Sequence, residues 1–218
     1  MFIGHYGLGF AAKRVAPGVS LGVLFGAAQL ADILWPFLLA LGLEQVRIDP
    51  GNTVFTPLDF VSYPYSHSLV LLGVWGVAMG WLFARRHRHG IAIVAALVAS
   101  HWVLDFVTHR PDMPVYPGGP EFGLGLWNSV ATTVAVEVPM YLAGAWLYMR
   151  ATRARDGIGR WGLVLLVSTL LLIYVGDALT SDAPPSVGAL TAVAAIGGAL
   201  FTAWSWWADR HRTVVPAR

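Results

Sequence analysis

Residues 91–109, IAIVAALVASHWVLDFVTH, combine an apolar run with three ionisable side chains. The first nine residues are entirely apolar, and His101, Asp105 and His109 follow at positions i, i+4 and i+8. In an α-helix these positions share one face and are separated by roughly 6 Å along the axis. Ionisable groups at membrane depth normally face a bundle interior and serve a function. The stretch therefore predicts a membrane helix whose polar face either binds a metal ion or joins helices through hydrogen bonds.

The composition of the chain is that of an integral membrane protein. Of the 218 residues, 56% are hydrophobic and only 12% are charged, and the mean hydropathy is +0.62. A soluble domain carries about 25% charged residues. The absence of cysteine excludes disulfides, iron–sulfur clusters and thiolate metal sites, so any metal must be held by His, Asp and Glu. A net charge of +2 in such a chain does not indicate a nucleic-acid partner.

Hydropathy predicts an all-α protein of one domain with about six transmembrane helices. The expected spans cover residues 19–43, 69–83, 91–109, 127–149, 161–180 and 187–208. Residues 2–15 are too short to span and predict a re-entrant or interfacial helix, which ends before the turn at Pro17-Gly18. Residues 1–149 would form the core of the site, and residues 150–218 would add two further helices.

Local signals set the expected details of these helices. Pro36 predicts a kink in the first span. Ser66 is expected to cap the second span, with His67 in its first turn, and Asn128 or Ser129 is expected to cap the fourth. Residues 44–64 and 111–126 are expected to be loops, the second of them rich in Pro and Gly.

Basic residues mark one side of the membrane. Twelve of the 14 Lys and Arg residues lie at Lys13 and Arg14 near the end of the short first segment, in the segments 85–89 and 150–160, and in the C-terminal segment. Only Arg47 and Arg110 lie elsewhere. The positive-inside rule places the N- and C-terminal basic segments in the cytoplasm and residues 44–64, 110–126 and 181–186 outside. His67, Asp105 and His109 then lie near the outer ends of their helices.

Further candidate site residues come from other parts of the chain. His5 lies 12 residues before Pro17 and Asp32 lies 15 after it, so a hairpin about this turn would bring the two to a similar depth. The alternative interpretation is that His5 and His67 lie at the membrane interface and bind no metal. Glu137 lies near the middle of the fourth span, where an unpaired carboxylate costs roughly 2–3 kcal/mol. Its carboxylate is either a catalytic group or pairs with a polar group of another helix.

These donors suit a divalent metal ion, most simply Zn²⁺, with Mn²⁺ or Fe²⁺ as alternatives. A zinc ion with an open coordination position lowers the pKa of a bound water to about 7. Two ions side by side could stabilise both the attacking and the leaving oxygen in the hydrolysis of a phosphoester. Asp32 or Asp105 could bridge two ions, and a free carboxylate would act as general base. Asp105 and Glu137 are the catalytic candidates. The candidate metal ligands are His5, Asp32, His67, His101, Asp105 and His109.

Four short motifs resemble a known family. The early His5, the Asp32 within an apolar helix, the triplet Ser66-His67-Ser68 and the pattern Ser100-His101-x-x-x-Asp105 are similar to bacterial inner-membrane metal-dependent hydrolases, which often carry a LexA-binding label. The His-x-x-x-Asp pattern also remotely resembles zinc-dependent phospholipase C and P1 nuclease. The resemblance covers roughly residues 1–140, and it implies a bacterial inner-membrane protein with metal-dependent hydrolase activity.

The chain departs from the pattern of that family at two motifs. The family motif Pro-Asp-x-Asp appears here as Ala31-Asp32-Ile33-Leu34, without the second acid, and the motif His-Arg-Gly-x-Thr-His-Ser lacks its first His and its Arg. Fewer ligands predict a mononuclear or altered site.

The functional prediction is a membrane-embedded hydrolase of an ester or phosphoester, with a lipid-like substrate because the site lies in the bilayer. The alternative is a non-catalytic membrane subunit, or an ion or proton transporter that uses the same His/Asp/Glu cluster. A di-iron oxidase fits the ligand types but lacks the paired Glu-x-x-His motifs of helical bundles. Serine hydrolases, P-loop NTPases and zincins find no support, since Gly-x-Ser-x-Gly, P-loop and His-Glu-x-x-His motifs are absent from the sequence.

Overall fold

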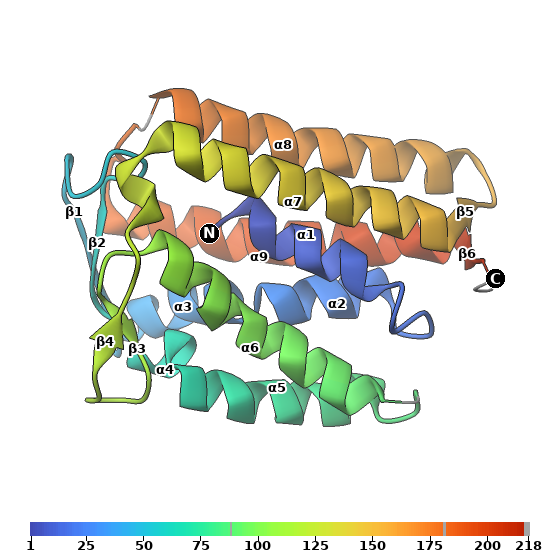
Figure 1. Ribbon diagram of the computed structural model, residues 1–218, viewed down its shortest axis with the longest axis horizontal. Helices are drawn as coiled ribbons and strands as arrows, with labels where there is room; N and C mark the ends of the chain where they lie inside the picture. Colours follow the sequence, from blue (N-terminus) through green and yellow to red (C-terminus); the bar gives the residue numbers. More distant parts are fainter. Residues whose placement is uncertain (88, 181, 216–218) are drawn as a thin grey trace.

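The computed structural model describes residues 1–87, 89–180 and 182–215, and this part of the chain is mostly helical (Figure 1). A short 3-10 helix, Leu126–Asn128, and a π-helical turn, Ile158–Gly162, lead into two of the long helices. The α-helices are α1 (Ile3–Ala12), α2 (Leu21–Ala28), α3 (Leu30–Ala40), α4 (Pro64–His67), α5 (Leu69–Ala84), α6 (Gly90–Thr108), α7 (Val130–Ala151), α8 (Leu163–Thr180) and α9 (Val187–Arg210).

Short antiparallel ribbons close the two ends of the bundle. The pairs are β1 (Gln45–Ile48) with β2 (Leu58–Ser62), β3 (Met113–Pro114) with β4 (Glu121–Phe122), and β5 (Thr152–Ala154) with β6 (Arg212–Val214). The first two ribbons lie at the left end in Figure 1, and the third joins α7 to the C-terminal segment at the right end. The segments 44–64 and 111–126 were predicted as plain loops, and the structure corrects this: each contains a hairpin.

Four helical segments are long and apolar enough to cross a membrane: α6, α7, the stretch Gly157–Thr180 that contains α8, and α9. The pair α2 and α3 makes a fifth if it counts as one span, although it is bent by 58°. With 16 residues, α5 is shorter than a full span. The described residues thus provide four or five candidate spans, and the predicted six are not confirmed.

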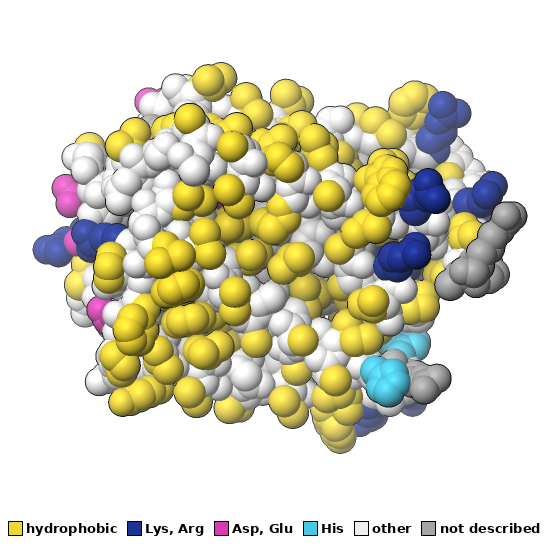
Figure 2. Space-filling model, in the orientation of Figure 1, with side chains coloured by type: hydrophobic (Ala, Val, Ile, Leu, Met, Phe, Trp, Pro, Cys, Tyr) yellow, Lys and Arg dark blue, Asp and Glu magenta, His cyan; other side chains and the backbone are white. Residues whose placement is uncertain are grey.

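The surface of the helices has the character of a membrane protein. Large apolar side chains face outward along α8 and α9, among them Leu172, Leu179 and Val193. Apolar side chains cover much of the middle of the face in Figure 2, whereas Lys and Arg lie at its two ends, most of them at the right-hand end. Because water penalises such an apolar surface and lipid does not, the fold is that of a membrane protein.

The first predicted span, residues 19–43, is broken at Gln29 and not at Pro36. Gln29 has φ −107° and ψ 11° and separates α2 from α3, whereas Pro36 lies within α3. The 58° bend between α2 and α3 is thus at Gln29, and the kink at Pro36 stays a prediction. The break also leaves the carbonyl of Ala28 at a helix end, where it is available to a side chain from α6.

The predicted hairpin about Pro17 is present. α1 lies inside the bundle, where it packs against α7 and α2 (Figure 1). The contact with α7 is a backbone contact, since a Cβ on Gly144 would lie only 2.0 Å from the carbonyl oxygen of Gly7. Small residues allow this approach, which brings His5 of α1 toward the centre of the bundle. His5 is 1% exposed, so it is not an interfacial side chain.

Two predicted helix starts are settled by the structure. Ser66 and His67 belong to the short helix α4, and Ser68 is the N-cap residue of α5, so the prediction that Ser66 caps this helix was wrong. The proline at position 64 starts α4 as a separate turn, as proline favours the first helical position. At α7, Ser129 accepts a hydrogen bond from the amide of Thr132 and confirms the predicted cap.

Candidate metal centre

Helix α6 supplies the centre of the site. His101 and Asp105 lie one turn apart on its buried face, and His101 Nε2 is 3.0 Å from Asp105 Oδ2. His109 is the C-cap residue of α6, just beyond its last turn, and its Nε2 lies 3.9 Å from the same carboxylate oxygen. The predicted polar face of this helix is thus buried, and all three of its ionisable side chains converge.

His5 joins this centre from α1. Its Nε2 lies 3.0 Å from Asp105 Oδ1, and its ring stacks on that of His101 with 3.8 Å between centroids and 3° between planes. The amine of Met1 contacts the same carboxylate oxygen. His5, His101 and Asp105 can offer one ligand atom each, all within 4.8 Å of one another, which is the spacing that one ion requires.

A second group shares His101 with the first. His67 Nε2 lies 3.4 Å from Asp32 Oδ1 and 3.9 Å from Asp105 Oδ2, and His101 Nε2 lies 3.8 Å from Asp32 Oδ1. Asp32, His67 and His101 form another set of ligand atoms within 4.8 Å. Two overlapping sets that share one imidazole fit one ion between them, or two ions side by side. The donors are imidazole and carboxylate, which suit Zn²⁺, Mn²⁺ and Fe²⁺.

The backbone and neighbouring side chains fix the orientation of two imidazoles. His101 Nδ1 lies 2.8 Å from the carbonyl oxygen of Ala28, which accepts its proton at the break between α2 and α3. His67 Nδ1 lies 2.7 Å from Ser66 Oγ, and Ser66 Oγ donates to Glu44 Oε2 at 2.7 Å. In both rings Nε2 then keeps its lone pair and faces the carboxylates. Metal-binding histidines are typically held in this way.

Glu44 is a residue that the sequence did not single out, because it lies in a polar segment before β1. It is 2% exposed and accepts hydrogen bonds at 2.8 Å from the amides of Tyr65 and Ser66. One carboxylate therefore holds both the backbone of α4 and the hydroxyl that orients His67.

Replacement of Glu44 by glutamine is expected to weaken metal affinity about 10–100-fold, as loss of such orienting partners typically does. The amide can no longer accept all three hydrogen bonds, so Ser66 loses the acceptor that aligns its hydroxyl. Competition with a chromogenic chelator measures the affinity. Glu121→Gln, an exposed change in β4, is the matched control. Equal metal affinity in the two variants would contradict the role of Glu44 in orienting His67.

His109 has its own partners at the outer end of α6. Its Nδ1 lies 3.0 Å from Asp112 Oδ1 and 3.2 Å from the hydroxyl of Tyr63, which donates to Asp112 at 2.7 Å. Burial lowers the pKa of His109, although the hydrogen bond with Asp112 opposes this. Burial and the charge of Asp112 raise the pKa of the Tyr63 hydroxyl. A neutral imidazole is the form that can bind a metal.

Glu137 lies beside the site rather than within either ligand set. Its Oε2 accepts hydrogen bonds from the amides of Phe2 at 2.8 Å and Gly4 at 3.1 Å, at the N-terminal end of α1. The side chain is fully buried, and Oε1 has no hydrogen-bond partner among the described residues. A carboxylate in this place satisfies the free amides of a helix start, which holds α1, and with it His5, against α7.

A cavity of about 300 Å³ reaches the site between α3, α8 and α9. Asp32 lines this cavity, and its side chain is 41% exposed, unlike the other residues of the two ligand sets. Asp177 of α8, which is not among the predicted site residues, also lines it. The remaining lining is mostly apolar: Phe2, Tyr6, Ile33, Trp35, Ile173, Val193 and Phe201.

No family model, curated protein sequence or solved structure matches this chain. The similarity to inner-membrane hydrolases therefore remains a resemblance carried by the motifs around His5, Asp32, His67 and His101. What the site can do follows from the side chains themselves: buried imidazoles and carboxylates from α1, α3, α4 and α6, with one exposed carboxylate at a cavity.

Proposed function

We propose that the protein is a membrane-embedded, metal-dependent hydrolase of an ester or phosphoester. The observation that supports this most is the pair of overlapping His/Asp sets that share His101, with imidazoles already oriented by Ala28 and Ser66. A purely structural polar face needs one partner for each polar group. Nε2 of His101 instead lies close to two carboxylates at once, 3.0 Å from Asp105 Oδ2 and 3.8 Å from Asp32 Oδ1, with the imidazoles of His5 and His67 beside it.

Some of these residues would bind the ion, and Asp32 would take part in the reaction. His5, His101 and Asp105 are buried and would hold the ion. His67 and Asp32 complete the second set, and Asp32 lines the cavity. Such an ion, most simply Zn²⁺, would act as a Lewis acid and make water reactive near neutral pH. The carboxylate of Asp32 reaches the cavity, so its free oxygen is placed to take the proton from an attacking water. Glu137 supports the site by holding α1.

The cavity favours a substrate with an apolar part. Aromatic and aliphatic side chains of α3, α8 and α9 line it, while Asp32 contributes a polar end. A lipid-like ester could place its chain along α8 and α9 and its scissile bond at the metal. In this arrangement the last two helices, α8 and α9, would bind the apolar chain of the substrate.

Hydrolysis by the purified protein tests the proposed function. Phospholipid and carboxyl-ester probes are incubated with protein reconstituted in liposomes, with and without added Zn²⁺. We expect turnover that requires metal and that His67→Ala abolishes. Metal binding without turnover of either probe, together with proton flux across the liposomes, would favour the transporter alternative.

We further propose that the protein lies in a bacterial inner membrane with its basic end in the cytoplasm. The basic segments that follow α1, α5 and α7 lie at one end of the bundle, opposite the β1–β2 and β3–β4 ribbons (Figure 1). Arg88 and Arg218, which belong to the predicted basic segments, lie outside the described residues. Short basic segments are retained in the cytoplasm.

Cysteine labelling checks this orientation, since the chain has no native cysteine. We expect an impermeant thiol reagent to label Gly119→Cys but not His87→Cys in intact cells. Gly119 lies in the turn between β3 and β4, and His87 in the turn between α5 and α6. Labelling of His87→Cys alone would reverse the orientation and place the site toward the cytoplasm.

A further inference from the structure

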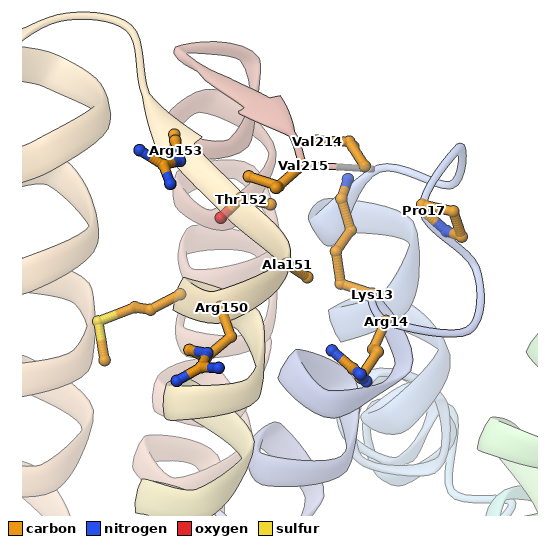
Figure 3. A pocket seen from close by; sticks show the side chains of 10 residues that line it. Lys13, Arg14, Pro17, Arg150, Ala151, Thr152, Arg153, Val214 and Val215 are labelled. Carbon is orange, nitrogen blue, oxygen red and sulfur yellow. The ribbon is translucent and has the colours of Figure 1, made fainter. Parts of the chain in front are cut away.

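The basic end of the bundle contains a second, larger cavity, of about 840 Å³. Lys13, Arg14 and Pro17 form one side of it, and residues at the end of α7 and in β5 form the other (Figure 3). Its lining includes Arg14, Arg150, Arg153, Met149 and Val215. Neither the metal centre nor its cavity shares any of these residues.

The cavity carries positive charge that the described residues do not neutralise. Lys13 is satisfied, because its ammonium donates to Asp209 at 2.8 Å and to the carbonyl of Val19 at 2.9 Å. Arg14, Arg150 and Arg153 form no ion pair among the described residues, and the guanidinium of Arg150 lies only over the ring of Trp146.

The acids nearest to this end are already engaged. Asp209 accepts hydrogen bonds from Lys13 and from the hydroxyl of Tyr148, and Asp156 pairs with His211 at 2.7 Å. All three arginines line the cavity, so its described lining carries an excess of positive charge, which attracts an anion.

Four Arg–Trp pairs place this cavity at the level of a membrane surface. The guanidinium carbons of Arg85, Arg150, Arg160 and Arg210 lie 4.4–5.3 Å from the ring centroids of Trp81, Trp146, Trp161 and Trp206. These residues come from α5, α7, the turn before α8, and α9, all at the same end of the bundle (Figure 1). Tryptophan and arginine gather where the acyl chains meet the headgroups. The cavity thus lies at headgroup depth.

We propose that this cavity binds the phosphate of an anionic ligand, with Arg14, Arg150 and Arg153 as its donors. Guanidinium groups form paired hydrogen bonds with phosphate oxygens. Basic pockets between membrane helices on the cytoplasmic side are where anionic headgroups bind. Met149 and Trp146, which are about half exposed, would contact the acyl chains of a lipid. The same chemistry would bind free phosphate, and the experiment separates the two sources. The proposal does not depend on the hydrolase function.

Thermal shifts of the purified protein in a neutral detergent test this site. The probes are short-chain phosphatidylglycerol, short-chain phosphatidylcholine and inorganic phosphate. We expect phosphatidylglycerol to raise the Tm of the wild type and phosphatidylcholine to leave it unchanged. A comparable shift with inorganic phosphate would identify free phosphate as sufficient, and none would identify the lipid; either supports the site. No shift with any of the probes would overturn it.

A pair of double variants separates the cavity from general electrostatics. R14Q/R153Q removes two of the proposed donors, whereas R85Q/R86Q removes the same charge from the same end of the bundle outside the cavity. We expect R14Q/R153Q to weaken binding at least ~10-fold and R85Q/R86Q to bind as the wild type does. Val215→Trp adds bulk to the wall of the cavity while keeping every charge, and it should reduce the shift. Equal weakening in both double variants would overturn the proposal.

Discussion

Replacement of Asp105 by asparagine is expected to reduce bound metal to background and to abolish hydrolysis. The carboxylate of Asp105 lies within 3.9 Å of four imidazoles, those of His5, His67, His101 and His109. Its carboxylate supplies the only negative charge in the set that contains His5 and His101. The loss of affinity should therefore exceed the roughly 10–100-fold that follows the loss of an orienting partner.

Elemental analysis of the purified variant measures this effect. Asp156→Asn, which removes an exposed carboxylate at the opposite end of the bundle, is the control and should keep full metal. His101→Ala should lose metal as Asp105→Asn does, because His101 belongs to both ligand sets. The helical content should stay near that of the wild type, since the apolar faces still pack. Full occupancy in both variants would contradict the ligand assignment.

Replacement of Gly144 by valine is expected to lower stability and metal content together. A Cβ at this position would lie 2.0 Å from the carbonyl oxygen of Gly7, so α1 must move away from α7. Overpacking of this kind typically costs about 1–3 kcal/mol. The movement would also displace His5, which lies two residues before Gly7 in α1.

Thermal unfolding and metal analysis of the same samples check this prediction. Gly176→Val in α8 is the matched control, because its Cβ would meet no atom within 4 Å. That variant should keep both the Tm and the metal of the wild type. A stable Gly144→Val protein with full metal would show that the close contact of α1 and α7 is not needed to place His5.

The sequence was most informative where one helix carries the chemistry. The spacing of His101, Asp105 and His109 predicted one polar face on α6, and the structure brings all three together. The turn signal at Pro17-Gly18 indicated a hairpin, and the residue count on either side of it placed His5 and Asp32 at a similar depth. Composition was sufficient to identify a membrane protein, since charged residues are scarce throughout.

Other features depend on contacts between distant segments and were not predictable. The break at Gln29 has no local proline or glycine signal, yet it places the Ala28 carbonyl against His101. Glu44 looked like a loop residue, and only the fold brings it to Ser66. A mid-helix carboxylate such as Glu137 fits either a ligand or a helix-end acceptor, and the sequence does not show the position of α1.

The metal content of the wild-type protein, purified without added metal or chelator, tests the central claim most directly. We expect one or two equivalents of a divalent ion per chain, most simply zinc, that Asp105→Asn removes. Wild-type protein that is folded, fails to retain any divalent ion and does not bind zinc when it is supplied would contradict the claim that these imidazoles and carboxylates form a metal centre.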